Sequence, residues 1–182
     1  MMSGGNIRPV LPYLGLPVIA AVLFFARAGK TDMFVLLWFE LVSVFGYLAS
    51  VYDLKSKKIP NGLVLAMIFA WVLTLVPNLV LNTDFALSML KESGLGFLVG
   101  GGLFLLVYLI SRKGLGGGDV KFMAAAGLYL GFSGTLSAML YGSVLAALVG
   151  VGLILLKKMG KKDSMPLAPF LYAGILITVF WI

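Results

Sequence analysis

The chain alternates long apolar runs with short polar stretches. An α-helix needs about 20 apolar residues to cross the ~30 Å hydrocarbon core of a bilayer, so each long run is a candidate membrane span. Seven runs qualify: residues 10–26, 33–51, 63–81, 94–110, 120–132, 135–156 and 166–182. The pattern therefore predicts an all-α fold, a polytopic transmembrane helical bundle of about seven spans.

The predicted number of spans is six to seven, because the fifth run, 120–132, is short for a span. As a helix it extends only ~20 Å, which is too short to cross unaided unless one end is recessed or the bilayer thins. Small residues at four-residue spacing predict where helices pack closely in lipid. They are Gly96 with Gly100, Gly127 with Gly131, and Gly142 with Ala146.

Lysine and arginine are distributed unevenly between the two sides of the predicted bundle. Because cytoplasmic loops carry the excess of positive charge, the richer side is predicted to be cytoplasmic. That side holds Arg8, Lys55, Lys57, Lys58, Arg112, Lys113, Lys121, Lys157, Lys158, Lys161 and Lys162, and the other holds Arg27, Lys30 and Lys91. The N-terminus and the loops at 52–60, 111–121 and 157–165 would then face the cytoplasm.

Composition also indicates lipid as the solvent. The chain is 61% hydrophobic and 12% charged, whereas soluble domains are ~45–50% apolar and ~25% charged. Its net charge of +7 could suit nucleic acid, but the positive residues lie between apolar runs, so no nucleic-acid partner is expected. The absence of cysteine and histidine excludes disulfides, thiol and imidazole chemistry, and His- or Cys-built metal sites.

Of the seven acidic residues, four fall in predicted polar loops and a fifth lies inside a predicted span. Asp32, Asp84, Glu92 and Asp163 fall in predicted polar loops, and we expect them to be solvated surface charges. Glu40 lies about 10 Å inside the second run, where an ionised carboxylate costs at least ~2–3 kcal/mol unless it is paired or protonated. It should face the bundle or be neutral, and its role, structural or functional, stays open.

Asp53 and Asp119 are predicted to lie at the same depth, on the cytoplasmic face. Asp53 ends the second run, and Asp119 opens the fifth run directly after Gly116-Gly117-Gly118. Consecutive glycines leave the backbone beside Asp119 open and free to take positive φ, so an extended segment of another chain could lie against it. Glu40 is ~20 Å along the helix from Asp53, so these two cannot form one site.

Two aspartates suffice to hydrolyse a peptide bond. At ~3 Å both carboxyls cannot ionise, so the charged member activates water while the protonated member donates to the carbonyl oxygen. Because the proton belongs to the pair, neither role is assigned to a named residue. Structural alternatives remain: Asp119 as a helix N-cap before Val120, and Asp53 as the partner of Lys55, Lys57 or Lys58.

These residues resemble the motifs of the type IV prepilin peptidase family, which includes the archaeal preflagellin peptidases and belongs to the GxGD intramembrane aspartyl peptidases. The motifs are Asp53 with the basic stretch and Ile59-Pro60-Asn61, and Gly116-Gly117-Gly118-Asp119-Val120-Lys121. The Pro-Leu-Ala-Pro-Phe-Leu stretch at 166–171 is a weaker resemblance. Since the resemblance covers about residues 35–182, we expect a peptidase core at 33–182 and an extra N-terminal transmembrane segment at 1–32.

The resemblance implies that Asp53 and Asp119 are catalytic and that the substrate is a prepilin-like membrane protein, a type IV pilin or archaellin precursor. Its basic leader would be removed at the cytoplasmic face of the cell membrane. The residues expected to bind substrate or shape the site are Gly116, Gly117, Gly118, Lys121, Pro60 and Asn61. No cofactor and no metal are expected. Long bacterial members carry an N-terminal domain with cysteine pairs and methylate the new N-terminus, so this cysteine-free chain is expected to lack methyltransferase activity.

Other interpretations stay open. A small proton-coupled transporter or channel could use Glu40, Asp53 and Asp119 as relay or gating carboxylates. A non-catalytic membrane assembly factor could be built on a peptidase-like scaffold. The first segment could also be a signal peptide, with Arg8 before the apolar run and a small-x-small site at 26–28.

Overall fold

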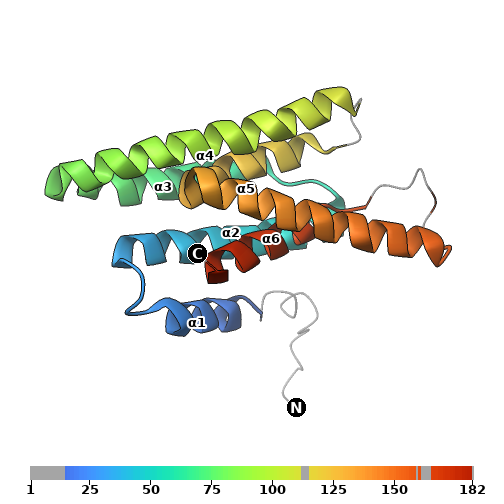
Figure 1. Ribbon diagram of the computed structural model, residues 1–182, viewed down its shortest axis with the longest axis horizontal. Helices are drawn as coiled ribbons and strands as arrows, with labels where there is room; N and C mark the ends of the chain where they lie inside the picture. The colour runs from blue at the N-terminus through green and yellow to red at the C-terminus, as the bar shows by residue number, and fades with distance from the viewer. Residues whose placement is uncertain (1–14, 112–114, 159, 161–164, 182) are drawn as a thin grey trace, which may run out of the picture.

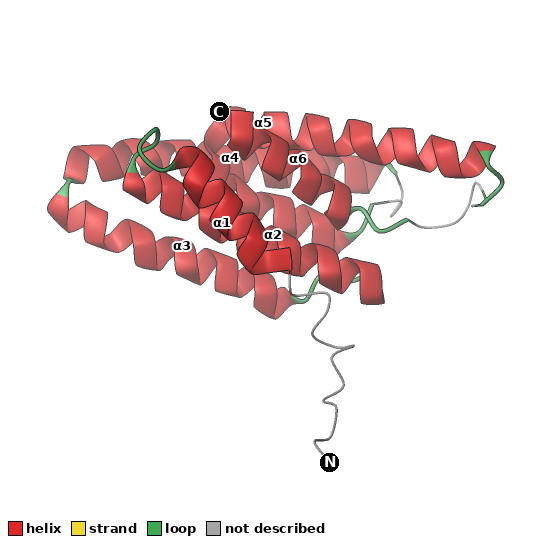
Figure 2. Cartoon of the chain, turned by 90° about the horizontal axis from the view of Figure 1, so that it is seen from below, coloured by secondary structure: helices red, strands yellow, loops and turns green. Residues whose placement is uncertain are grey.

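The structure, a computed structural model, describes residues 15–111, 115–158, 160 and 165–181. The helices in these parts of the chain are α1 (Gly15–Arg27), α2 (Met33–Ser56), α3 (Asn61–Leu81), α4 (Thr83–Ile110), α5 (Gly117–Leu155) and α6 (Ala168–Trp181). No strand occurs among the described residues (Figure 2), and the all-α prediction is confirmed. Residues 10–14 of the first predicted span, and Arg8, Arg112, Lys113, Lys161, Lys162 and Asp163, lie outside the described ranges.

The described helices indicate a membrane protein. Four of them, α2 to α5, are long and apolar enough to cross a bilayer, whereas α1 and α6 are apolar but shorter. Length and composition alone therefore identify four spans. A total of seven requires α1, α6 and each half of α5 to be counted separately.

Helix α5 turns back on itself at Gly131, where the backbone leaves the helical conformation (φ 67°, ψ −171°). In Figure 1 its first leg runs beside α4 and its second leg returns in the opposite direction. The contacts agree, because Gly100 of α4 approaches Met123 before the bend and Thr135 after it. A positive φ in this position favours glycine. The two legs correspond to the predicted fifth and sixth spans.

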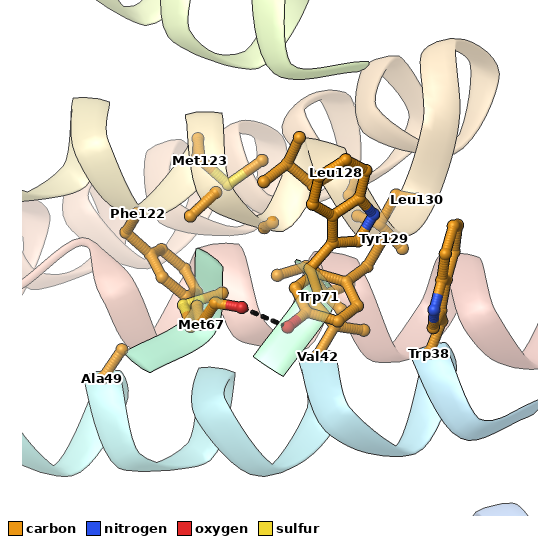
Figure 3. Close-up of a cluster of buried hydrophobic side chains, with 14 of the residues drawn as sticks. Trp38, Val42, Ala49, Met67, Trp71, Phe122, Met123, Leu128, Tyr129 and Leu130 are labelled. Atoms are coloured by element: carbon orange, nitrogen blue, oxygen red, sulfur yellow. Dashed lines mark hydrogen bonds between the residues drawn. The ribbon is translucent and has the colours of Figure 1, made fainter. Parts of the chain in front are cut away.

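The short first leg of α5 lies in the middle of the bundle. Every residue from 122 to 130 is buried. Figure 3 shows Phe122, Met123 and Tyr129 packed in one cluster with side chains of α2 and α3, including Val42 and Trp71. A helix covered by protein does not have to match the bilayer thickness on its own, which accounts for a leg too short to span unaided.

Glycines bring α4 and α5 into backbone contact, as their spacing predicted. A Cβ added to Gly96 would lie 2.1 Å from the carbonyl oxygen of Gly127, and one added to Gly127 would lie 2.2 Å from that of Gly96. A Cβ on Gly142 of the second leg would lie 2.9 Å from Leu171 Cα in α6. Larger residues at these positions would force the helices apart.

The predicted polar loop before the fourth span is wrong. Helix α4 begins at Thr83, so Asp84, Lys91 and Glu92 lie within it. Its leucine, lysine and glutamate residues favour the helix, and Asp84 lies in its first turn, at the positive end of the helix dipole.

Helix α1 packs outside α2 and reaches α6 (Figures 1 and 2). Its Leu23 is fully buried, and the Arg27 guanidinium donates from Nε to the carbonyl oxygen of Val179 at 3.0 Å. This contact ties the end of α1 to the last turns of α6.

Candidate active site

Asp53 lies in the last turn of α2 and is buried, with 5% of its surface exposed. The helix ends at Lys57, whose left-handed backbone (φ 51°) lets its N–H donate to the Asp53 carbonyl oxygen at 2.8 Å. The chain then turns through Ile59 and Pro60 into α3, which begins at Asn61. Asp53 therefore lies at the end of α2, next to the short connection to α3.

The start of α6 lies against Asp53. The backbone N–H of Ala168 donates to Asp53 Oδ2 at 3.0 Å. Ser50, one turn earlier on α2, donates from Oγ to the carbonyl oxygen of Ala168 at 3.3 Å and to that of Gly46 at 2.8 Å. The proline-containing stretch at 166–171 thus supplies a donor to one candidate catalytic carboxylate. Sequence analysis missed Ser50, although its position three residues before Asp53 places both on one helix face.

Asp119 is the third residue of α5 and is also buried, with 7% of its surface exposed. The N-cap position belongs to Gly116, and no side chain caps this end, so the alternative of Asp119 as the N-cap is wrong. Its Oδ1 is buried without a hydrogen-bond partner among the described residues. A buried carboxylate oxygen with no partner is unusual in a structural role and suits a group that receives a ligand.

The glycines before Asp119 provide space rather than unusual backbone angles. None of Gly116, Gly117 and Gly118 has a positive φ, so that part of the prediction is wrong. A Cβ on Gly116 would lie 2.6 Å from Asp119 Oδ2, and one on Gly118 would lie 3.2 Å from Ile59 Cβ. A Cβ on Gly117 would meet nothing within 4 Å. The run therefore lets the start of α5, which carries Asp119, lie close to Ile59 in the loop that follows Asp53.

Asp53 and Asp119 line one cavity of about 220 Å³, which we call the aspartate cavity. The other lining residues are Lys57, Lys58, Ile59, Asn61, Gly116, Gly117, Gly118 and Lys121. Lys121 Nζ donates to Asn61 Oδ1 at 3.1 Å, which joins α5 to α3 at its edge. Of the candidate site residues, only Pro60 does not line the cavity, and it instead occupies the N-cap position of α3.

This arrangement has the parts that acid–base hydrolysis needs. Two buried carboxylates from different helices border a space large enough for water and a peptide bond, and a backbone N–H fixes one of them. Within the described ranges, no group of three or more acidic side chains could hold a metal ion. Asp53 and Asp119 are the carboxylates among the residues that line the cavity.

The remaining described carboxylates have other surroundings. Asp32 caps α2, where its Oδ1 accepts from the N–H of Phe34 at 2.9 Å. Glu92 is more than a solvated charge, because its Oε2 accepts from the N–H of Phe132 at 3.3 Å and so caps the second leg of α5. Glu40 Oε1 is buried without a partner among the described residues, and Glu40 lines a separate pocket between α1 and α2.

Comparison with known proteins identifies related sequences. A model of the type IV leader peptidase family matches residues 40–151. The chain is 30% identical over 131 residues to the "Prepilin leader peptidase/N-methyltransferase" of Aeromonas hydrophila, which covers 71% of this chain and 44% of that protein. It is 31% identical over 150 residues to the Legionella pneumophila protein of the same name, covering 80% and 50%. For the Bacillus subtilis (strain 168) protein of that name the identity is 26% over 134 residues, covering 74% and 51%.

The chain spans about half the length of the curated relatives it matches. No solved structure gives a significant match. The family match includes both Asp53 and Asp119, the two carboxylates of the aspartate cavity. With more than half of its residues matched, the chain belongs to the type IV leader peptidase family.

Proposed function

We propose that this protein is a membrane-embedded aspartic endopeptidase of the GxGD class, in which Asp53 and Asp119 cleave the leader of prepilin-like precursors. The observation that carries the proposal is that both aspartates, from separate helices, line one cavity. Membership of the leader peptidase family supports the substrate class. Glu40 is not among the residues of that cavity, which favours a peptidase over a transporter that uses all three carboxylates.

In the proposed reaction the two carboxyls hold one proton between them. The ionised member takes a proton from water, which attacks the carbonyl carbon of the scissile bond, while the protonated member donates to the carbonyl oxygen. Collapse of the tetrahedral intermediate breaks the C–N bond, and the leaving amine takes up a proton. The hydrogen bond from the Ala168 N–H to Asp53 Oδ2 would keep that carboxylate oriented through both steps.

For the membrane arrangement, we propose seven spans, with the N-terminus and the aspartate cavity at the cytoplasmic face of the cell membrane. The described parts of the loops at 52–60, 111–121 and 157–165 lie toward one end of the bundle (Figure 1), as this topology requires. Residues 1–32 would be an extra segment beside a peptidase core at 33–182. The family match begins at residue 40, after this segment.

We also propose that these 182 residues cleave the precursor without methylating the new N-terminus. The support is the absence of cysteine, because the resemblance associates methylation with a cysteine-containing domain. Mass spectrometry of the cleaved product tests this point directly. An N-terminus heavier by one methyl group, formed when a methyl donor is supplied, would contradict it.

The aspartate pair is tested by Asp53→Asn and Asp119→Asn. Asparagine has nearly the same shape but cannot hold or release the proton, so each variant should lose cleavage of a prepilin-like substrate while remaining inserted and folded. Glu40→Gln is the matched control, since it also neutralises a carboxylate of α2 but outside the cavity. Substantial turnover by either asparagine variant in the purified assay would refute the aspartyl mechanism.

A further inference from the structure

A second pocket, lined by apolar side chains, adjoins the aspartate cavity. We call it the apolar pocket; it has a volume of about 410 Å³ and lies between Val64, Leu65 and Ile68 of α3, Phe97 of α4 and Ala124 of α5. Leu65 is 66% exposed and Phe97 is 40% exposed, so the pocket opens to the outside of the bundle. In a membrane helical protein, that outer surface faces lipid or another membrane helix.

The two pockets meet at one pair of residues. Asn61 and Lys121 line both of them, and the hydrogen bond between their side chains lies at the junction. They are the polar residues of the apolar pocket, and they lie at the end that reaches the aspartates. A chain that passes from one pocket to the other therefore crosses from apolar to polar surroundings at Asn61 and Lys121.

The spacing along α3 gives the size of the segment that fits. Asn61, Val64, Leu65 and Ile68 follow an i, i+3, i+4, i+7 pattern, so they form one face of the helix over two turns, ~10 Å. A partner that runs alongside would make contact over about two turns of its own helix. At the Asn61 end of this face, the Asn61 amide and the Lys121 ammonium provide donors that suit the backbone carbonyls of an extended segment.

Charge also favours binding through an apolar part of the substrate. Three lysines, Lys57, Lys58 and Lys121, line the aspartate cavity and outnumber its two aspartates, so this cavity is a poor match for a basic leader. A buried surface that attracts the substrate must then lie elsewhere. The adjoining apolar pocket is larger than the aspartate cavity and can receive the first turns of an apolar helix.

We propose that the apolar pocket holds the first two turns of the substrate's membrane helix, and that the extended segment before this helix crosses Asn61 and Lys121 to reach Asp53 and Asp119. The proposal rests on the proposed function and adds the path and the contacts of the substrate. It makes Leu65, Ile68 and Phe97 binding residues for an apolar segment. It also predicts that the substrate approaches over α3, α4 and α5 rather than along the exposed side of α2.

Disulfide cross-linking tests this path, because the chain has no cysteine of its own. The probe is a membrane peptide with a basic leader, a glycine-containing junction and an apolar helix, with one cysteine in the second helical turn. Leu65→Cys and Phe97→Cys, in the Asp119→Asn background, should cross-link to it several-fold more than three control positions. Phe69→Cys and Leu98→Cys are exposed neighbours outside the pocket, and Leu54→Cys is exposed on α2 near Asp53.

A size change in the pocket gives an independent measurement in the active enzyme. Leu65→Trp should fill the pocket and lower kcat/KM by about tenfold or more, mainly through a higher KM, since it weakens binding without touching the aspartates. Phe69→Trp, on the same helix but outside the pocket, should leave kcat/KM close to that of the starting protein. Thermal unfolding of both variants shows whether the effect comes from folding instead.

Failure of this inference can be told from failure of the proposed function. Cross-linking at Leu54 or Phe69 instead of Leu65, with normal cleavage by the starting protein, overturns the path and leaves the peptidase intact. Equal kcat/KM for the two tryptophan variants also overturns it, and means that lipid alone fills the pocket. Cleavage that survives Asp119→Asn refutes the aspartyl mechanism, whatever the cross-linking pattern.

Discussion

Three adjacent glycines allow the geometry around Asp119 to be tested one methyl group at a time. Alanine at Gly116, Gly117 or Gly118 adds a single Cβ, and the three added atoms meet different surroundings. None of the three has a positive φ, so alanine is not strained by the backbone there. Differences between the variants therefore report contacts of the added atom.

The contacts give the size of each effect. A Cβ on Gly116 lies 2.6 Å from Asp119 Oδ2, so an ordinary contact of 3.4 Å requires the carboxylate to move by about 0.8 Å. Misplacing a reacting group by ~1 Å can cost ~10²-fold in rate. The Gly116→Ala variant should lose activity by about that factor, mainly in kcat. Its free energy of unfolding should change little, because the atom displaced is the end of a side chain.

The other two positions supply the comparison. Gly117→Ala meets nothing within 4 Å and should keep its activity, with stability unchanged or raised by up to ~1 kcal/mol from the better helix propensity of alanine. Gly118→Ala places its Cβ 3.2 Å from Ile59 Cβ and 3.3 Å from Ile59 N. Overpacking costs ~1–3 kcal/mol, part of which the helix propensity offsets. Activity should fall to an intermediate level, since Ile59 belongs to the loop that follows Asp53.

The assay is cleavage of a prepilin-like substrate by purified protein, with kcat and KM measured separately, together with thermal unfolding of each variant. The expected order of activity is Gly117→Ala, then Gly118→Ala, then Gly116→Ala. If Gly116→Ala is as active as Gly117→Ala, the Asp119 carboxylate does not need the position described here. If Gly117→Ala loses as much activity as Gly116→Ala, the loss does not come from contact with Asp119.

Other contacts lead to further predictions. Ser50→Ala removes the hydroxyl that donates a hydrogen bond to the Ala168 carbonyl oxygen, so the free energy of unfolding should fall by ~0.5–1.5 kcal/mol and kcat should fall with it. A normal kcat would show that this contact does not position Asp53. Glu92→Ala leaves the N–H of Phe132 without its cap, which should lower the melting temperature at a cost of ~1 kcal/mol while the remaining folded enzyme cleaves normally. Glu40→Gln should have an unchanged kcat/KM, and a loss of activity at normal expression would show that Glu40 takes part in the reaction.

Sequence reasoning brought the two aspartates together because charge is rare in this chain. Asp53 and Asp119 could be singled out by their positions at the ends of apolar runs, and the expected equal depth brings them to one cavity in the structure. The helix contacts at Gly96 and Gly127 were also predictable, because close approach in lipid needs small residues at a fixed spacing. Such features depend on local patterns that the sequence displays directly.

Features that depend on partners distant in the chain could not be predicted. The hydrogen bond between Ala168 and Asp53 joins residues far apart in sequence, and no local pattern relates them. A break near Gly131 was expected from the boundary between the fifth and sixth runs, but the Glu92 cap that accompanies it comes from another helix. The role of the glycine run was misjudged for the same reason, since the need for space at Gly118 comes from Ile59 across the site.

Two helices begin beside the two buried aspartates. Helix α6 begins beside Asp53, and the first leg of α5 carries Asp119 at its own start. The first N–H groups of a helix have no partner within it and carry partial positive charge. Ala168 uses such a group on Asp53, and Asp119 lies within the first turn of α5.

Placing two carboxylates in a buried cavity is costly unless nearby donors or charges compensate. Here the start of α6 supplies a donor to Asp53 through the Ala168 N–H, and Lys57, Lys58 and Lys121 line the same cavity as both carboxylates. The first leg of α5 starts at Gly117 and ends at the bend at Gly131, and its buried position lets it be shorter than a full span. The run that looked too short for a span is thus a buried helix whose first turn places Asp119 in the aspartate cavity.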